Sequence, residues 1–204
     1  MSKRLVLFSR PSLQIFERLS EVLFPQYLDE RVFAYMPSEG DSPENAKYDP
    51  IWQEFTKINN AKLVYLNNSK RGDEAKVEKD KLLTANILMI TGGNTFKLLN
   101  HLRLSGLDDA IVEFWKKDNV VLSGFSAGAI ILTPRINISS QRATDLADEN
   151  SVGLKDLTGL NIIDFEIWPH FNPKLDQKVF DTYRSNCPNL IETVSDEEIK
   201  IIDK

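Results

Sequence analysis

One serine stands among the smallest residues of the chain, in the stretch GFSAGA at 124–129. The apolar run NVVLS precedes this stretch and IILTP follows it, so Ser126 is expected at a sharp turn from a strand into a short helix. The flanking glycines leave room for such a turn, and the hydroxyl then stands exposed, as a nucleophile must. The amide of Ala127, free at the start of the helix, could hold a developing oxyanion.

A base for that nucleophile can come from only two histidines, His101 and His170. His101 lies inside the expected helix at 95–106 and is interpreted as a surface or packing residue. His170 ends the apolar run IIDFEIWPHF at 162–171, which reads as a strand. A histidine at a strand end is held rigidly and partly desolvated at the same edge as Ser126, so His170 is the predicted general base.

The acid that would orient the imidazole is less constrained. Glu166 shares a strand face with His170, but the strand rise separates them by about 13 Å, too far for a direct hydrogen bond. The loop RATDLADENSVGL at 142–154 can fold back toward the histidine, and Asp148 and Glu149 are its candidates. For each of these acids, an ordinary solvated loop residue is the alternative reading.

The stretch TGGNTF at 91–96 could supply the other half of an oxyanion hole. Gly92 and Gly93 let the backbone approach a substrate closely, and Asn94 could touch the substrate or cap the helix that follows. An ordinary glycine turn is the alternative for this stretch alone. It is not a phosphate-binding loop, because the chain has no G-x-x-x-x-G-K-[ST] pattern.

The elements that must position these residues alternate between strand and helix. Strands are expected at 4–9, 31–37, 61–67, 85–93 and 119–126, and helices at 12–24, 50–59, 95–106 and 107–118, with a loop and then a charged helix over 68–83. This alternation predicts an α/β fold with a mostly parallel, doubly wound sheet covered by helices on both faces. In such sheets ligands lie beyond the carboxyl ends of the strands, which is where TGGN, GFSAG and His170 are expected.

Composition narrows the class of protein. The chain has 204 residues, a length typical of one domain, and we expect a single domain over 1–204. A formal net charge of -5 argues against nucleic acid or an anionic membrane as a partner. Cys187 is the only cysteine, which fits a reducing compartment, and no run is long enough for a signal peptide or membrane span. A cytoplasmic protein, monomeric or homodimeric, is expected.

Taken in order, GGNTFKLL, GFSAGA and WPHF resemble motifs of the peptidase E family of α-aspartyl dipeptidases, which are distantly related to cyanophycinases. The strong match covers about residues 85–173. The resemblance implies the three-layer αβα fold of class I glutamine amidotransferases. It also implies the roles of five residues: nucleophile Ser126, base His170, oxyanion-hole donors Gly93 and Ala127, and orienting acid Asp148.

The function expected from this resemblance is that of a serine peptidase acting on small peptides, such as dipeptides with N-terminal Asp, without a metal or other cofactor. Arg135 and Arg142 could meet an acidic side chain of the substrate. The segment after Ser126 is longer than in the dipeptidases proper, which leaves Glu149 open as the acid. Two alternatives remain: an esterase, which would lack an HGGG-type oxyanion loop here, and a non-catalytic member of the fold that binds a small molecule or partner.

Overall fold

The computed structural model describes residues 2–42, 45–141 and 146–204. In chain order its elements are β1 (Lys3–Phe8), α1 (Leu13–Leu23), β2 (Val32–Met36), α2 (Asn45–Ile58), β3 (Lys62–Tyr65), α3 (Gly72–Thr84), β4 (Ile87–Ile90), α4 (Thr95–Ser105), α5 (Leu107–Lys116), β5 (Val120–Phe125), α6 (Ala127–Ile130), the 3-10 helix η1 (Asn137–Ser140), β6 (Phe165–Pro169), α7 (Pro173–Asn186), β7 (Leu190–Val194) and β8 (Ile199–Asp203). The predicted α/β class is confirmed.

The strands form a six-stranded sheet of order β3-β2-β4-β5-β1-β8 and a separate two-stranded sheet of β6 and β7. Every neighbouring pair in the large sheet is parallel except β1 with β8, which is antiparallel. β6 and β7 pair in parallel, with Pro169 opposite Val194. The carboxyl ends of β4 and β5 therefore share one edge of the large sheet, while the strand before His170 belongs to the smaller sheet.

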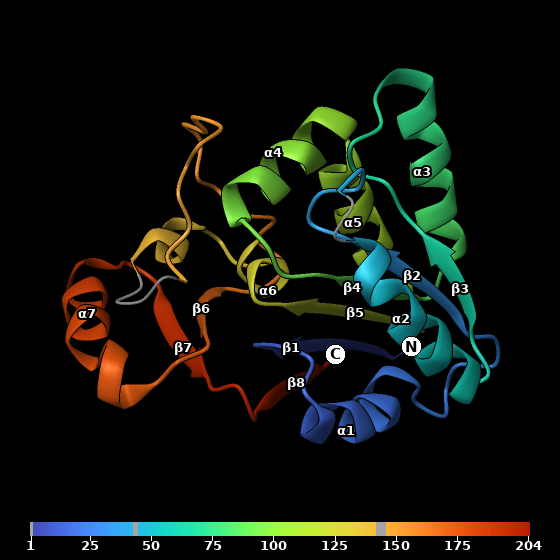
Figure 1. Cartoon of the computed structure of the whole chain (residues 1–204), viewed down its shortest axis with the longest axis horizontal. Coiled ribbons are helices and arrows are strands. Elements are labelled where there is room, and N and C mark those ends of the chain that lie inside the picture. The colour runs from blue at the N-terminus through green and yellow to red at the C-terminus, as the bar shows by residue number, and fades with distance from the viewer. Residues whose placement is uncertain (1, 43–44, 142–145) are drawn as a thin grey trace.

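Helices cover both faces of the large sheet, as Figure 1 shows: α3, α4 and α5 lie over one face, and α1 and α2 over the other. Alternation along β5 explains the layering. Val120 and Leu122 pack into the core beneath α4 and α5, whereas Val121 points into the core shared with α1 and α2. Because both faces of the strands are covered, the strands read as unbroken apolar runs, and the three-layer αβα arrangement is confirmed.

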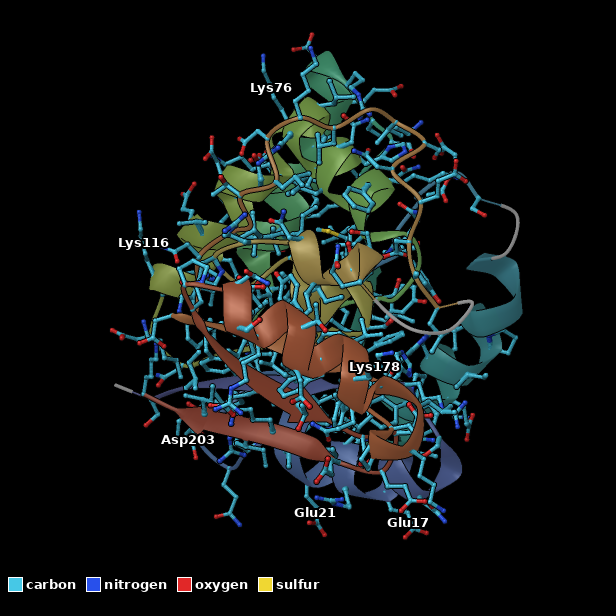
Figure 2. All side chains as sticks on the ribbon, turned by 90° about the vertical axis from the view of Figure 1, so that its left-hand side faces the viewer. Glu17, Glu21, Lys76, Lys116, Lys178 and Asp203 are labelled. Atoms are coloured by element: carbon cyan, nitrogen blue, oxygen red, sulfur yellow. The ribbon has the colours of Figure 1, made fainter. Side chains whose placement is uncertain are left out.

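The charged side chains labelled in Figure 2 point away from these layers. On α1, Glu17 and Glu21 are exposed, while Leu19 and Leu23 are fully buried against the sheet. This spacing of apolar residues three or four apart drives α1 onto the sheet. In the described part of the chain, no helix is long and apolar enough to cross a membrane.

One predicted detail of the fold was wrong, and two elements were not predicted. The second helix was expected to begin at Pro50, but α2 starts at Asn45 and contains that proline. Its ring removes one helical hydrogen bond, and the turn that follows packs the buried side chains of Trp52 and Phe55 edge to face. The helix α7 and the strand β7 were not predicted, and these two elements determine what lies beside His170.

Candidate active site

The expected sharp turn is present at Ser126. Its backbone adopts φ 51° and ψ -118° between β5 and α6, and its N–H donates to the carbonyl of Phe8 at 3.1 Å. Small neighbours are required, because a Cβ added at Gly128 would lie 2.2 Å from the carbonyl oxygen of Ile90. The short helix is thus packed against the end of β4, and the serine side chain is left facing a cavity.

His170 also has a backbone in the left-handed region, with φ 58°. Its N–H donates to the hydroxyl of Ser9 at 2.8 Å, and that hydroxyl donates to the carbonyl of Val194 at 2.9 Å. Ser9 is fully buried, so it ties the histidine backbone to the ends of β1 and β7. Non-glycine residues in such conformations cost on the order of 1–3 kcal/mol each and persist where surrounding contacts enforce them.

These turns bring three side chains into one chain of hydrogen bonds. His170 Nε2 lies 3.0 Å from Ser126 Oγ, and His170 Nδ1 lies 2.6 Å from Asp196 Oδ1. Arg10 contacts the second oxygen of the same carboxylate, with Nη2 2.9 Å from Oδ2. With Nδ1 donating to the carboxylate, Nε2 is left to accept the serine proton. The imidazole is only 12% exposed, so its orientation is fixed by these contacts.

The acid beside the histidine is therefore Asp196, which corrects the expectation of Asp148 or Glu149. The cause is the pairing of β6 with β7: Pro169 lies opposite Val194, so the residues that follow the two strands lie side by side. Asp148 instead contacts Thr95 at the start of α4, where its Oδ2 accepts from the Thr95 N–H at 3.0 Å and hydroxyl at 2.5 Å.

Three residues of this arrangement were missed by the sequence analysis: Ser9, Arg10 and Asp196. All follow the carboxyl end of a strand, the apolar β1 or the mixed β7. The rule that pointed to Ser126 and His170 applies to them equally. Asp196 was missed because acids were sought only between the serine and the histidine.

The glycine pair after β4 lies directly beside the serine. A Cβ added at Gly92 would lie 3.0 Å from Ser126 Cβ, and Gly92, Gly93 and Asn94 line the same cavity as Ser126. The Asn94 side chain is occupied by structural contacts: its Oδ1 accepts from Lys97 N–H at 3.0 Å, and its Nδ2 donates to the carbonyl of Glu149 at 2.9 Å. Asn94 thus caps α4.

The cavity at Ser126 has a volume of about 540 Å³, within the range of small-ligand sites. Aromatic side chains of Tyr35, Trp52 and Phe125 form part of its lining, and Arg10 and Glu39 add opposite charges. Across the residues that the structure describes, no group of three or more His, Cys, Asp or Glu side chains is placed to hold a metal ion.

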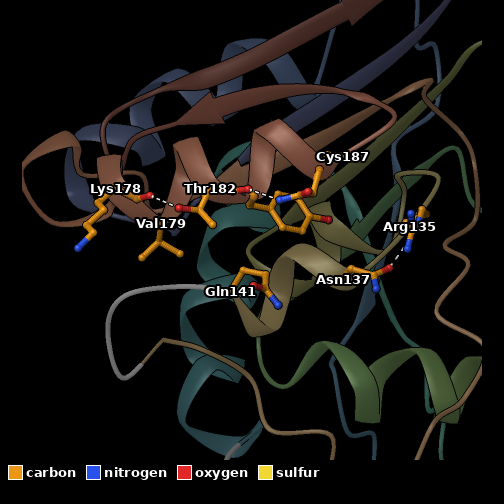
Figure 3. Close-up of a pocket in the computed structure, with 9 residues that line it drawn as sticks. Arg135, Asn137, Gln141, Lys178, Val179, Thr182 and Cys187 are labelled. Atoms are coloured by element: carbon orange, nitrogen blue, oxygen red, sulfur yellow. Dashed lines mark hydrogen bonds between the residues drawn. The ribbon is translucent and has the colours of Figure 1, made fainter.

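Arg135, expected to meet an acidic substrate, lines a different cavity of about 530 Å³ beside α7 (Figure 3). Its Nε donates to Asn137 Oδ1 at 3.1 Å, and its backbone pairs with Thr158. This pairing ties the chain after α6 to the segment before β6, so Arg135 is not among the residues that line the Ser126 cavity. Arg142, the other candidate, lies outside the described residues.

Glu166 has a structural role behind that second cavity. The carboxylate is fully buried and accepts hydrogen bonds from Tyr183 Oη at 2.5 Å, Asn189 Nδ2 at 2.9 Å and the Cys187 thiol. Burial, with the nearby Glu166 charge, raises the pKa of Tyr183 and that of Cys187. Both groups are thereby kept protonated, as donors to the buried carboxylate.

Comparison with known proteins agrees with this architecture. Residues 14–203 match the model of peptidase family S51. The chain is 35% identical over 113 residues to an uncharacterized peptidase of Pasteurella multocida, a match covering 53% of each chain. It is 30% identical over 127 residues to peptidase E of Shigella flexneri, covering 62% of this chain and 52% of that protein. The chain thus matches about half the length of these relatives.

Among solved structures, one described as a candidate peptidase E protein from Listeria monocytogenes EGD-e superposes with a TM-score of 0.75 at 25% identity, covering 100% of this chain and 98% of that one. A peptidase from an acI-B1 Actinobacterium shares the fold, with a TM-score of 0.73 at 18% identity. Since the family match spans almost the whole sequence, this chain belongs to peptidase family S51.

Proposed function

We propose that this chain is a serine-type peptidase that hydrolyses small peptides through an acyl-enzyme. The observation that carries the proposal is the hydrogen-bonded series from Ser126 Oγ through His170 to Asp196, at 3.0 and 2.6 Å. A nucleophile, a base and an orienting acid in this order are what acyl transfer needs. The membership of family S51 supports the same chemistry.

In the proposed mechanism, His170 Nε2 takes the proton from Ser126 Oγ as the oxygen attacks the scissile carbonyl carbon. Asp196 stabilises the imidazolium that forms and holds the ring in place. The amides of Gly93 and Ala127 meet the oxyanion. His170 then passes its proton to the leaving amine, and water, activated by the same imidazole, releases the acyl group from the serine.

The first substrates to test are dipeptides with N-terminal Asp, since the sequence motifs resemble those of α-aspartyl dipeptidases. Within the described part of the chain, Arg10 is the one Lys or Arg that lines the Ser126 cavity. It is placed to meet a substrate carboxylate while it holds Asp196. A cavity of about 540 Å³ suits a small peptide rather than a folded protein.

A fluorophosphonate probe tests the nucleophile directly, because it reacts with activated serines. We expect labelling of the wild-type chain at Ser126, and none in Ser126→Ala. Ser123→Ala is a matched control, because Ser123 is fully buried in β5 with its hydroxyl donating to the carbonyl of Val6. A folded wild-type chain that resists the probe would instead favour a non-catalytic, ligand-binding role.

A substrate panel then separates the enzyme classes. Asp-X dipeptides, dipeptides with neutral first residues and p-nitrophenyl esters should be compared by kcat/KM. Preference for Asp-X supports the finer proposal, preference for neutral dipeptides keeps the peptidase but removes the aspartyl specificity, and turnover of esters alone contradicts the peptidase.

A further inference from the structure

The loop ahead of β6 returns to the start of α4 and holds the two residues that follow the glycine pair. Asp148 Oδ2 accepts both the N–H and the hydroxyl of Thr95, at 3.0 and 2.5 Å. Asn94 Nδ2 donates to the carbonyl of Glu149 at 2.9 Å. Thr95 is fully buried, so its two bonds to Asp148 are partly shielded from water and are stronger than surface contacts, whereas the bond from Asn94 to Glu149 is exposed.

The backbone of Asp148 also fixes the loop to the segment that follows the nucleophile. The Asp148 N–H donates to the carbonyl of Ser139 at 2.9 Å. Ser139 is fully buried in η1, and its hydroxyl donates to the carbonyl of Ile136 at 2.8 Å. Because η1 follows α6 along the chain, Asp148 joins the segment after Ala127 to the segment after the glycine pair.

We propose that Asp148 is a positioning residue that fixes the spacing of the two oxyanion-hole amides, those of Gly93 and Ala127. It touches neither Ser126 nor His170 in any contact described above. It acts through Thr95, two residues beyond Gly93, and through Ser139. This inference rests on the proposed function, since it assigns a task within the same oxyanion hole.

Chemistry explains why an acid is suited to this position. The first N–H groups of a helix have no partner within the helix, and the helix dipole favours a negative charge beside them. A carboxylate at the start of α4 therefore binds the Thr95 N–H tightly. The same oxygen takes the hydroxyl proton, which leaves the side chain of Thr95 with a single orientation.

The role predicts a specific kinetic signature. Oxyanion-hole donors act on the transition state more than on the bound substrate, so their displacement lowers kcat with little change in KM. Partial displacement of one donor should cost roughly 10- to 100-fold in kcat, less than the roughly 10²- to 10³-fold lost when a donor is removed. An acid that merely stabilised the fold would change the melting temperature without this split.

Asp148→Ala, Asp148→Asn and Thr95→Val test the proposal in the full-length protein. Asp148→Ala should lower kcat by roughly 10- to 100-fold with KM within about threefold. Asp148→Asn should recover most of that loss, because its amide oxygen can still accept from both groups of Thr95. Thr95→Val keeps the shape and loses one bond, and should lower kcat several-fold. Asp164→Ala, an exposed acid of the same segment, is the control and should match wild type.

Wild-type kcat in Asp148→Ala would overturn the inference. So would an Asp148→Asn variant that is as inactive as a variant without the Asp196 carboxylate. If Asp148→Ala does not fold, as judged by circular dichroism, Thr95→Val decides: unchanged kcat overturns the inference. Failure of the proposed function looks different, because the wild-type chain would then resist the fluorophosphonate probe whatever stands at position 148.

Discussion

The two sides of the cleft around Ser126 are built from different parts of the chain. On the imidazole side, His170 and Asp196 present side chains, joined by a 2.6 Å hydrogen bond. On the amide side, Gly93 and Ala127 present backbone N–H groups in the proposed mechanism. The first side is assembled from the adjacent ends of β6 and β7 in the small sheet, and the second from the adjacent ends of β4 and β5 in the large sheet.

This difference determines how each side can be damaged. A side chain can be removed while the backbone stays in place, so the imidazole side should fail when one functional group is lost. A backbone amide is present whatever the residue, except proline, so the amide side should fail only when its neighbours move it. Residues that fix the backbone, such as Gly92 and Asp148, therefore matter on the amide side in the way that Asp196 matters on the other.

The largest effect is expected from Asp196→Asn. The amide keeps the size of the side chain but favours the wrong imidazole tautomer, so kcat should fall by about 10³- to 10⁴-fold, as in other serine triads. Steady-state turnover of the best dipeptide measures this. Glu197→Gln, at the next position and exposed, is the matched control and should retain wild-type turnover. If Asp196→Asn kept a tenth of the activity, the imidazole side would not depend on its acid.

The next largest effect is expected on the amide side, from Gly92→Ala. The added methyl would lie 3.0 Å from Ser126 Cβ and 3.1 Å from the ring of Phe125, so the loop or the serine must shift. We expect kcat to fall by about 100-fold, with substrate affinity less affected. Thermal melts should accompany the kinetics. Wild-type kcat in a folded variant would show that the loop tolerates displacement, contrary to the proposed oxyanion hole.

A smaller effect is expected from Ser9→Ala, which removes a positioning contact of the imidazole side. The part-buried His170 N–H would lose the hydroxyl that accepts from it, whereas the Val194 carbonyl would keep the Phe171 N–H as a donor. The free energy of unfolding should fall by on the order of 1–3 kcal/mol. Turnover should fall by about 10-fold as the imidazole loosens. Ser140→Ala, at an exposed position, should change neither urea-induced unfolding nor turnover.

The amide side was predictable from sequence because its signals are local. Gly92, Gly93 and the GFSAGA turn each follow an apolar run directly, and the residues that create the close approach are neighbours in the chain. The helix α7 carried a local signal too, since Asn172 caps it and Pro173 opens it, yet it was not predicted. Most strands of the large sheet were predicted, because apolar runs alternate with helical segments along the chain.

The imidazole side was only half predictable, because its acid is brought in by a long-range pairing. Asp196 lies 26 residues beyond His170, and only the parallel register of β6 with β7 places it beside the ring. No spacing within one segment encodes that register. The placement of Arg135 has a related cause: its backbone pairs with Thr158 from a distant segment, and its side chain lines the cavity beside α7 instead.

The smallest expected effect distinguishes the two histidines, one on each side of the cleft. His101 lies in α4, the helix that starts beside the amide side, and its Nδ1 is 3.4 Å from Arg71 Nη2. Partial burial, with the charge of Arg71, lowers the pKa of His101 from its ordinary 6.5. The unfolded chain therefore binds a proton at His101 more readily than the folded chain. Stability from this group is intact above pH 6.5 and declines as the pH falls below it.

His101→Gln removes that acid-sensitive group while leaving His170 untouched. The melting temperature of the variant minus that of wild type, measured at the same pH, should rise by about 1 °C from pH 8 to pH 5. The shift is small because the ring is partly exposed. Its kcat/KM profile should keep the wild-type acid limb, since His170 is then the only remaining imidazole and the proposed base. Loss of that limb in His101→Gln would mean that the α4 histidine takes part in the reaction. The amide side would then contribute a side chain as well as backbone N–H groups, contrary to the comparison.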